Sequence, residues 1–292
     1  MNDVRIRIDL AYDGTAFHGW ATQPGLRTVQ EELQAALATA LRVRAPEGER
    51  AQVWVTVAGR TDSGVHARAQ VVHFDIDADV LTSSRRRSDL SALGALVRRL
   101  NGILPADVRV HRAIEAPEGF NARFSALSRR YVYRVVDVPE YVDPLQRHSV
   151  LYRTRPLDLS VMNVASADLL GLNDFATFCK AREGATTIRD LRQLTWSRRE
   201  DGIIEATVVA DAFCHSMVRS LVGCVMEIGE GRRDVTWAKE MLAARTRSSA
   251  LPIAPANGLT LEEVTYPPDD MLAAQHVRTM NRREASELDR DR

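Results

Sequence analysis

The densest group of potentially reactive side chains lies in one short segment between two strand-like stretches. It runs Gly59-Arg60-Thr61-Asp62-Ser63-Gly64-Val65-His66. Its two glycines permit an unusual backbone and the close approach of another molecule, so the turn would hold Asp62 at its tip, with Arg60 two positions away. Hydrolysis of the glycosidase type would need a second carboxylate, which this motif lacks. The alternative is an ordinary turn in which Asp62 bonds its own backbone and Arg60 is solvated.

An arginine within an apolar helix is the second candidate. Apolar residues occupy almost the whole circumference of the helix predicted from Phe213 to Ile228, which indicates burial, and Arg219 lies in its middle. A buried guanidinium needs a carboxylate or phosphate partner, because an unpaired buried charge is costly. Arg219 therefore faces an active-site carboxylate, forms a structural ion pair with another acid, or extends its charge to the surface.

Two tyrosines form the third candidate. Tyr131 and Tyr133 fall on one face of a strand predicted from Arg130 to Val136. Tyrosines in strands are usually packing residues, but beside a basic surface an aromatic ring can stack on a nucleobase. Arginines do cluster along the chain, for example at 85–87, and local basic surface matters more for nucleic-acid binding than net charge. No octapeptide typical of an RNA-recognition motif is present.

Composition and missing motifs narrow the function further. The 292 residues carry 39 basic and 39 acidic side chains, and they contain no HExxH, calcium-loop, GxGxxG, P-loop or GxSxG pattern. The three cysteines are scattered, so we expect neither a disulfide framework nor a structural zinc site. We therefore expect the protein to lie in a reducing cytoplasm. No apolar stretch is long enough to span a bilayer, and no secretory signal is expected. A cofactor-free enzyme or a binding protein is favoured.

Alternating strands and helices are predicted to position these residues. The first half is predicted to contain a strand at 4–10, a helix from the capping box Thr28-Val29-Gln30-Glu31, strands at 52–58 and 70–76, a helix capped by Ser88 and ended by Asn101-Gly102, and a strand at 108–114. The second half is predicted to contain a strand at 130–136, a helix at 160–170, a hairpin of strands at 191–199 and 203–209, a helix at 213–228, a short helix capped by Asp234, and a strand at 261–266.

This order of elements indicates an α+β fold with two similar halves and largely antiparallel sheets. We place the first domain, which carries Asp62, at residues 1–114 and the second at 115–268. The remaining residues, 269–292, are polar and mixed in charge, and we expect them to be a mobile tail.

Six ordered segments resemble the tRNA pseudouridine synthase A family. The turn at 59–66, followed by Gln70-Val71-Val72-His73-Phe74, is similar to the family's catalytic segment. The other five matching segments are Tyr12-Asp13-Gly14 and Gly19-Trp20 together with Thr28 to Glu31, Asn121 to Ala126 with Arg130 to Tyr133, Asn173 to Phe175, Phe213 to Arg219 with Gly223, and Ala254 to Leu259. The resemblance spans residues 4–267. It departs at Ala21, Ser63 and Ala67 and at the arginine-rich stretch around 85–87, and none of these is the aspartate.

The resemblance implies an isomerase that converts uridine to pseudouridine in the anticodon stem-loop of tRNA, typically at positions 38, 39 and 40. It implies that Asp62 is the nucleophile and that Arg60, Tyr131 and Arg219 bind the substrate, with Arg219 beside Asp62. It also implies two α+β domains that share one long, mostly antiparallel sheet, a homodimer, and no cofactor or metal. The remaining alternative is a non-catalytic RNA-binding or chaperone protein on the same scaffold, which would not need these four residues together.

Overall fold

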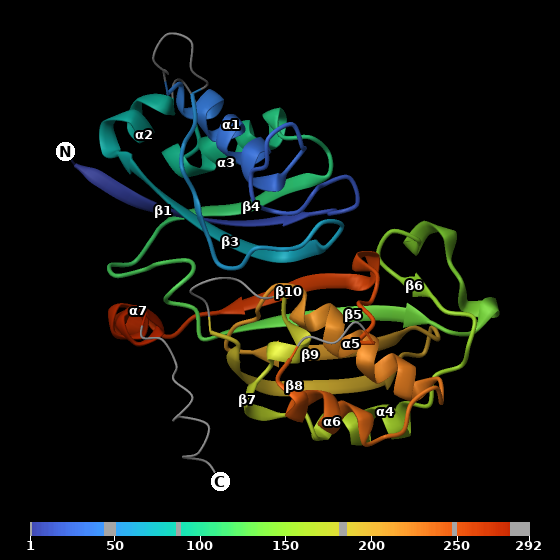
Figure 1. Ribbon diagram of the computed structural model, residues 1–292. Helices are drawn as coiled ribbons and strands as arrows, with labels where there is room; N and C mark the ends of the chain where they lie inside the picture. Colours follow the sequence, from blue (N-terminus) through green and yellow to red (C-terminus); the bar gives the residue numbers. More distant parts are fainter. Residues whose placement is uncertain (1, 44–50, 86–88, 181–185, 247–249, 281–292) are drawn as a thin grey trace. The chain divides into compact units, whose positions relative to one another are not determined.

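The computed structural model describes residues 2–43, 51–85, 89–180, 186–246 and 250–280. It divides into two compact units (Figure 1). The first unit comprises Met1–Leu127 with Glu263–Met280, and the second comprises Ser128–Glu262. Each unit is built of a mostly antiparallel sheet with flanking helices, so the predicted α+β class is confirmed.

The first unit is built on strand β1, which pairs antiparallel with β3 on one side and β4 on the other. Its strands are β1 (Asp3–Tyr12), β2 (Thr56–Val57), β3 (His66–Asp77) and β4 (Val108–Glu115), and its helices are α1 (Val29–Leu41), α2 (Ala78–Ser84) and α3 (Ala92–Ile103). Figure 1 shows the three helices on one side of these strands. Because β1 alternates as predicted, Ile6, Ile8 and Leu10 are buried.

Helix ends in this unit differ from the sequence prediction where long-range contacts intervene. Helix α1 does follow Thr28, but the fully buried Thr28 side chain makes no capping bond. Helix α3 is capped by Ser91, whose hydroxyl accepts from the Gly94 N–H, whereas Ser88 lies outside the described residues. The helix also continues past Asn101, because the Asn101 amide exchanges two hydrogen bonds with the Val110 backbone instead of ending the helix.

The second unit has strand order β10-β5-β9-β8-β7, with β6 parallel to β5. Its strands are β5 (Ser128–Val136), β6 (Leu151–Tyr152), β7 (Gly171–Asp174), β8 (Ile188–Arg198), β9 (Ile204–Ala210) and β10 (Leu259–Thr265). Strand β10 belongs to the second unit as far as Glu262, and its last residues belong to the first. Its helices are α4 (Leu159–Ala167), α5 (Met217–Gly229) and α6 (Trp237–Ala244). Short 3-10 turns occupy Pro139–Tyr141, Pro144–Gln146, Ala176–Phe178 and Ala256–Gly258. The predicted hairpin is confirmed as β8–β9.

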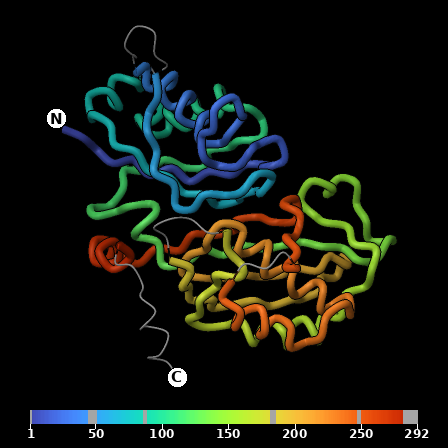
Figure 2. The backbone as a smooth tube through the Cα atoms, in the orientation of Figure 1, coloured from blue at the N-terminus to red at the C-terminus, as the bar shows by residue number. Residues whose placement is uncertain are grey.

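The chain after Pro268 forms further helical structure instead of an irregular tail. A 3-10 turn at Asp269–Met271 leads into α7 (Leu272–Met280), which Figure 2 shows beside the segment that precedes β5. The contact is specific, since the Phe124 and His276 rings stack 5.5 Å apart and Leu272 is buried. Local pattern did not predict α7 because Leu272 is its only buried residue. The rest of the expected tail, 281–292, lies outside the described residues.

A buried histidine in β3 makes the stability of the first unit depend on pH. The His73 Nδ1 accepts a hydrogen bond from the Ala122 N–H at 3.1 Å. Burial lowers the pKa of His73 to about 4; the charges of Arg5 and His276 lower it too, and Asp75 opposes them. His73 is therefore neutral in the folded protein at neutral pH.

As the pH falls from about 6.5 to about 4, His73 becomes protonated in the unfolded chain but stays neutral in the folded protein. The free energy of unfolding should therefore fall. We expect His73→Asn to weaken the pH dependence of the unfolding free energy in this window by up to about 1.4 kcal/mol per pH unit. Urea unfolding between pH 4.5 and 7 measures it, with His111→Asn, at an exposed position of β4, as the control. Parallel curves for wild type and His73→Asn would contradict the assignment.

Candidate active site

The turn that carries Asp62 joins β2 to β3 and is held by the backbone of an earlier segment. The Val65 N–H donates to the Asp62 carbonyl at 3.1 Å, which closes the turn. Two further bonds reach the Phe17 carbonyl, from the Gly64 N–H and the Ser63 hydroxyl, both at 3.2 Å. Gly64 has a φ of 77°, which glycine adopts without strain. Asp62 is thus carried on a closed, anchored turn.

Gly14 allows this close packing. A Cβ atom at Gly14 would lie 2.0 Å from the Val65 carbonyl oxygen, so only glycine fits beneath the turn. The Trp20 N–H also donates to the Thr61 carbonyl at 3.0 Å. The turn at 59–66 and the stretch from Tyr12 to Trp20, both of which resemble the family, therefore pack against each other.

We expect Gly14→Ala to destabilise the protein by about 2–3 kcal/mol, because the methyl group forces backbone apart in a packed site. Gly102→Ala is the matched control: nothing lies within 4 Å of the added methyl group, and alanine favours the helix. Urea unfolding of both variants measures the difference. Equal urea-unfolding midpoints for Gly14→Ala and wild type would show that the turn accommodates the methyl group without loss of stability.

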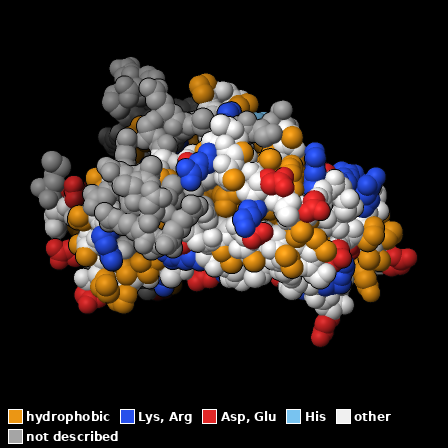
Figure 3. Space-filling model, turned by 60° about the horizontal axis from the view of Figure 1, so that its bottom comes forward, with side chains coloured by type: hydrophobic (Ala, Val, Ile, Leu, Met, Phe, Trp, Pro, Cys, Tyr) orange, Lys and Arg blue, Asp and Glu red, His pale blue; other side chains and the backbone are white. Residues whose placement is uncertain are grey.

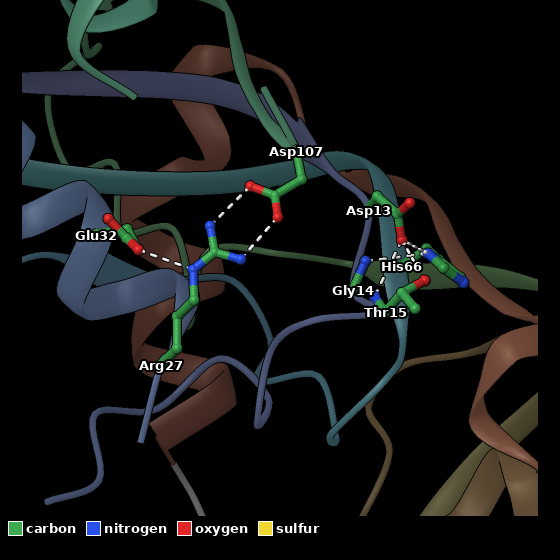
Figure 4. Close-up of polar contacts among 7 residues, drawn as sticks. All are labelled: Asp13, Gly14, Thr15, Arg27, Glu32, His66 and Asp107. Carbon is green, nitrogen blue, oxygen red and sulfur yellow. Dashed lines mark hydrogen bonds and ion pairs between the residues drawn. The ribbon is translucent and has the colours of Figure 1, made fainter. Parts of the chain in front are cut away.

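Polar and charged side chains contact the segment that holds the turn (Figure 4). The His66 Nδ1 accepts from the Gly14 N–H at 3.0 Å and lies 3.1 Å from an Asp13 oxygen. Arg27 donates to both oxygens of Asp107, at 2.7 and 2.9 Å, and to Glu32 at 2.9 Å. Its guanidinium also lies 4.1 Å from the centre of the Phe17 ring. Arg27 therefore packs against Phe17, the residue whose carbonyl accepts the two bonds from the turn.

Arg60 is placed differently from these structural arginines. It is exposed on the turn, and among the described residues its guanidinium has no hydrogen-bond or ion-pair partner. On the face shown in Figure 3, basic and acidic side chains are interspersed with hydrophobic ones. Many other arginines form ion pairs, such as Arg134, whose Nε lies 2.9 Å from a carboxylate oxygen of Glu205. Arg60 therefore offers a positive charge that the fold does not use.

Tyr131 and Tyr133 are both buried in β5 of the second unit. The Tyr131 ring meets the edge of Phe213, with centres 5.3 Å apart and planes at 88°. The Tyr133 hydroxyl donates to the Pro255 carbonyl at 2.9 Å, and burial raises the pKa of Tyr133. Both rings thus have the packing contacts expected of strand tyrosines.

Arg219 lies in the first turn of α5, not in the middle of the helix as predicted. The helix begins at Met217 because Ser216 has a left-handed backbone, with φ 64°, which ends the loop from Phe213. The Arg219 Nε donates to the Ala254 carbonyl at 2.6 Å, and the Ala254 N–H donates to the Arg219 carbonyl at 3.0 Å. A backbone carbonyl is therefore one partner of this arginine, and it orients the guanidinium.

The cysteines form one disulfide, which their scattered spacing did not predict. Cys179 and Cys214 are bonded, 35 residues apart in the sequence. The neighbouring Lys180 N–H donates to the His215 carbonyl at 3.0 Å, so the two loops run side by side. Cys224 is free and buried, and burial raises its pKa to about 12. Scattered spacing gave no sign of the pair because the fold, not the local sequence, brings the two loops together.

Asp62 and Arg60 thus lie in the first unit, and Tyr131 and Arg219 in the second. Sequence reasoning did not single out Tyr12 and Gln70, whose side chains reach the turn from the core, although both stand within segments that resemble the family. Within the described residues, no cluster of three potential metal ligands occurs. None of the described helices has the length and apolar character needed to cross a membrane.

Comparisons with known proteins agree along almost the whole chain. The family model described as tRNA pseudouridine synthase matches residues 165–267. The tRNA pseudouridine synthase A of Streptomyces griseus is 51% identical over 279 residues, which cover 95% of this chain and 93% of that protein. The protein of the same name from Frankia casuarinae is 52% identical over 272 residues, with 93% of each chain covered. That of Mycobacterium leprae is 49% identical over 287 residues, with 96% of each covered. The chain therefore belongs to the tRNA pseudouridine synthase A family.

Proposed function

We propose that the protein is a tRNA pseudouridine synthase, an isomerase that converts uridine to pseudouridine at positions 38, 39 and 40 of the anticodon stem-loop. The observation that carries this proposal is the anchored turn that presents Asp62, in a chain about half identical to synthases along nearly its full length. The alternative is a non-catalytic RNA-binding or chaperone protein on the same scaffold.

The reaction needs a nucleophile and a fixed pocket. The bond between C1′ of the ribose and N1 of the uracil breaks, the base turns, and a bond forms between C1′ and C5, while the hydrogen of C5 is lost and N1 gains a proton. Product and substrate are isomers, so no electrons or groups pass to a cofactor. The Asp62 carboxylate would attack the sugar or the uracil, or would assist cleavage, and each route needs the base out of its stack.

The other three residues have distinct parts in this proposal. Arg219 binds the substrate, in an orientation of the guanidinium that its bond to the Ala254 carbonyl supports. The Tyr131 ring lies over the flipped uracil, and its contact with Phe213 supports a fixed ring plane. Arg60, exposed and not paired among the described residues, contacts the RNA backbone.

The assembly belongs to the same proposal. The two units correspond to the two domains of the pseudouridine synthase fold. The protein works as a homodimer in the cytoplasm. Sedimentation of the purified protein as a monomer would contradict the dimer.

Mapping pseudouridines in unmodified tRNA transcripts after incubation with the purified protein tests the function. We expect new pseudouridines at positions 38 to 40. Transcripts with cytidine at these positions are the control and should gain none. Tight binding of tRNA without any pseudouridine would favour the non-catalytic alternative.

A further inference from the structure

Three buried polar side chains form a chain of hydrogen bonds that leads from the core of the first unit to the turn. Gln70, in β3, is 0% exposed, Tyr12, at the end of β1, is 4% exposed, and Thr61, immediately before Asp62, is 6% exposed. At this point the register between β1 and β3 shifts, a kind of bulge that often re-aims side chains near active sites. The chain therefore begins in the rigid sheet and ends beside Asp62.

Hydrogen bonds link the three side chains in series. The Gln70 Nε2 donates to the Gly59 carbonyl at 2.9 Å and to the Tyr12 Oη at 3.1 Å. The Gln70 Oε1 accepts from the Val71 N–H at 3.2 Å, which sets the orientation of the amide. The Tyr12 Oη and the Thr61 Oγ1 lie 2.7 Å apart and share a hydrogen bond in which either hydroxyl can donate. Burial raises the pKa of Tyr12 to about 12, so the phenol keeps its hydrogen at neutral pH.

Packing alone does not explain three polar groups here. Phenylalanine, valine and leucine would fill the same volumes without the cost of burying hydroxyl and amide groups. The polar chain instead ties down two points of the turn, the Gly59 carbonyl and the Thr61 side chain. The bond from the Trp20 N–H to the Thr61 carbonyl adds a third. These points lie on either side of Arg60 and directly before Asp62.

We infer that Gln70, Tyr12 and Thr61 are positioning residues, which set the direction of the Asp62 carboxylate from within the core. The inference rests on the proposed function, because it assigns these residues a part in the same reaction. A fully satisfied buried network holds a single geometry, and the loss of one member releases the turn without unfolding the sheet.

Single-turnover rates with tRNA at saturating enzyme test the inference. We expect Tyr12→Phe and Thr61→Val each to slow the reaction about 10- to 100-fold, while the Kd for tRNA changes by less than about twofold. Thr61→Ser keeps the hydroxyl and should restore the rate to within about threefold of wild type. The double variant Tyr12→Phe/Thr61→Val should be no slower than the slower single variant, because both changes break the same chain.

Tyr266→Phe is the matched control, since it removes another tyrosine hydroxyl of the first unit, which donates to the Ala122 carbonyl at 2.7 Å. Its rate should equal that of wild type. Wild-type rates for Tyr12→Phe and Thr61→Val would overturn the inference, as would an equal loss of rate in Tyr266→Phe.

Amide hydrogen exchange at residues 59–65 gives a readout that needs no activity. We expect exchange there to accelerate about tenfold in Tyr12→Phe and to stay unchanged in Tyr266→Phe. Unchanged exchange in Tyr12→Phe would overturn the inference. If the wild-type protein makes no pseudouridine, the proposed function fails, and the exchange measurement still decides whether the chain of side chains holds the turn.

Discussion

Asp62→Asn is expected to abolish pseudouridine formation while tRNA binding survives. Asparagine keeps the shape of the side chain and its place on the anchored turn, but an amide cannot act as the nucleophile. We expect the single-turnover rate to fall at least about a thousandfold, since neither nucleophilic attack nor assisted cleavage can proceed without the carboxylate. Binding depends mainly on contacts with the phosphates and should change little.

Filter binding and pseudouridine mapping on the same tRNA preparation measure the two effects separately. Asp79→Asn, which removes an exposed carboxylate near the start of α2, is the control and should keep full activity. Near-normal pseudouridine formation by Asp62→Asn would refute the assignment of the nucleophile. A parallel loss of binding would instead indicate that the carboxylate is needed to hold the turn together.

Arg219→Ala is expected to reduce activity about 100- to 1000-fold, because the positive charge that we propose for binding the substrate is lost. The variant should also lose about 1 kcal/mol of stability, since the Ala254 carbonyl loses the 2.6 Å bond from the guanidinium. Arg219→Lys should recover part of the activity, because it keeps the positive charge but not the orientation that Nε provides.

Steady-state rates and urea unfolding of both variants measure these effects. Arg232→Ala is the matched control: it removes an arginine just beyond the other end of α5, where Arg232 pairs with Glu227 at 3.0 Å. Its activity should stay close to that of wild type. Full activity in Arg219→Ala would exclude Arg219 from the site, and equal losses in both variants would indicate a general effect on α5.

Local sequence was sufficient for those parts of the protein whose determinants lie close together in the chain. The alternation in β1 and the turn between β8 and β9 involve neighbouring residues, so periodicity and turn chemistry predicted them. The turn that carries Asp62 is also contiguous, and it could be singled out for the same reason. The family followed from six such segments in order, and the full-length comparisons confirm it.

Only the tertiary structure revealed contacts between residues that are distant in the chain. Tyr12 and Thr61 are 49 residues apart, Tyr12 and Gln70 are 58 apart, and Cys179 and Cys214 are 35 apart. The start of α5 and the end of α3 were decided in the same way, by a left-handed Ser216 and by the bonds of Asn101 to β4. Hydrogen bonds and packing depend on distance in space, whereas periodicity records only neighbours along the chain. The sequence alone therefore singled out Asp62 as the proposed nucleophile, and the fold decided what holds its turn in place.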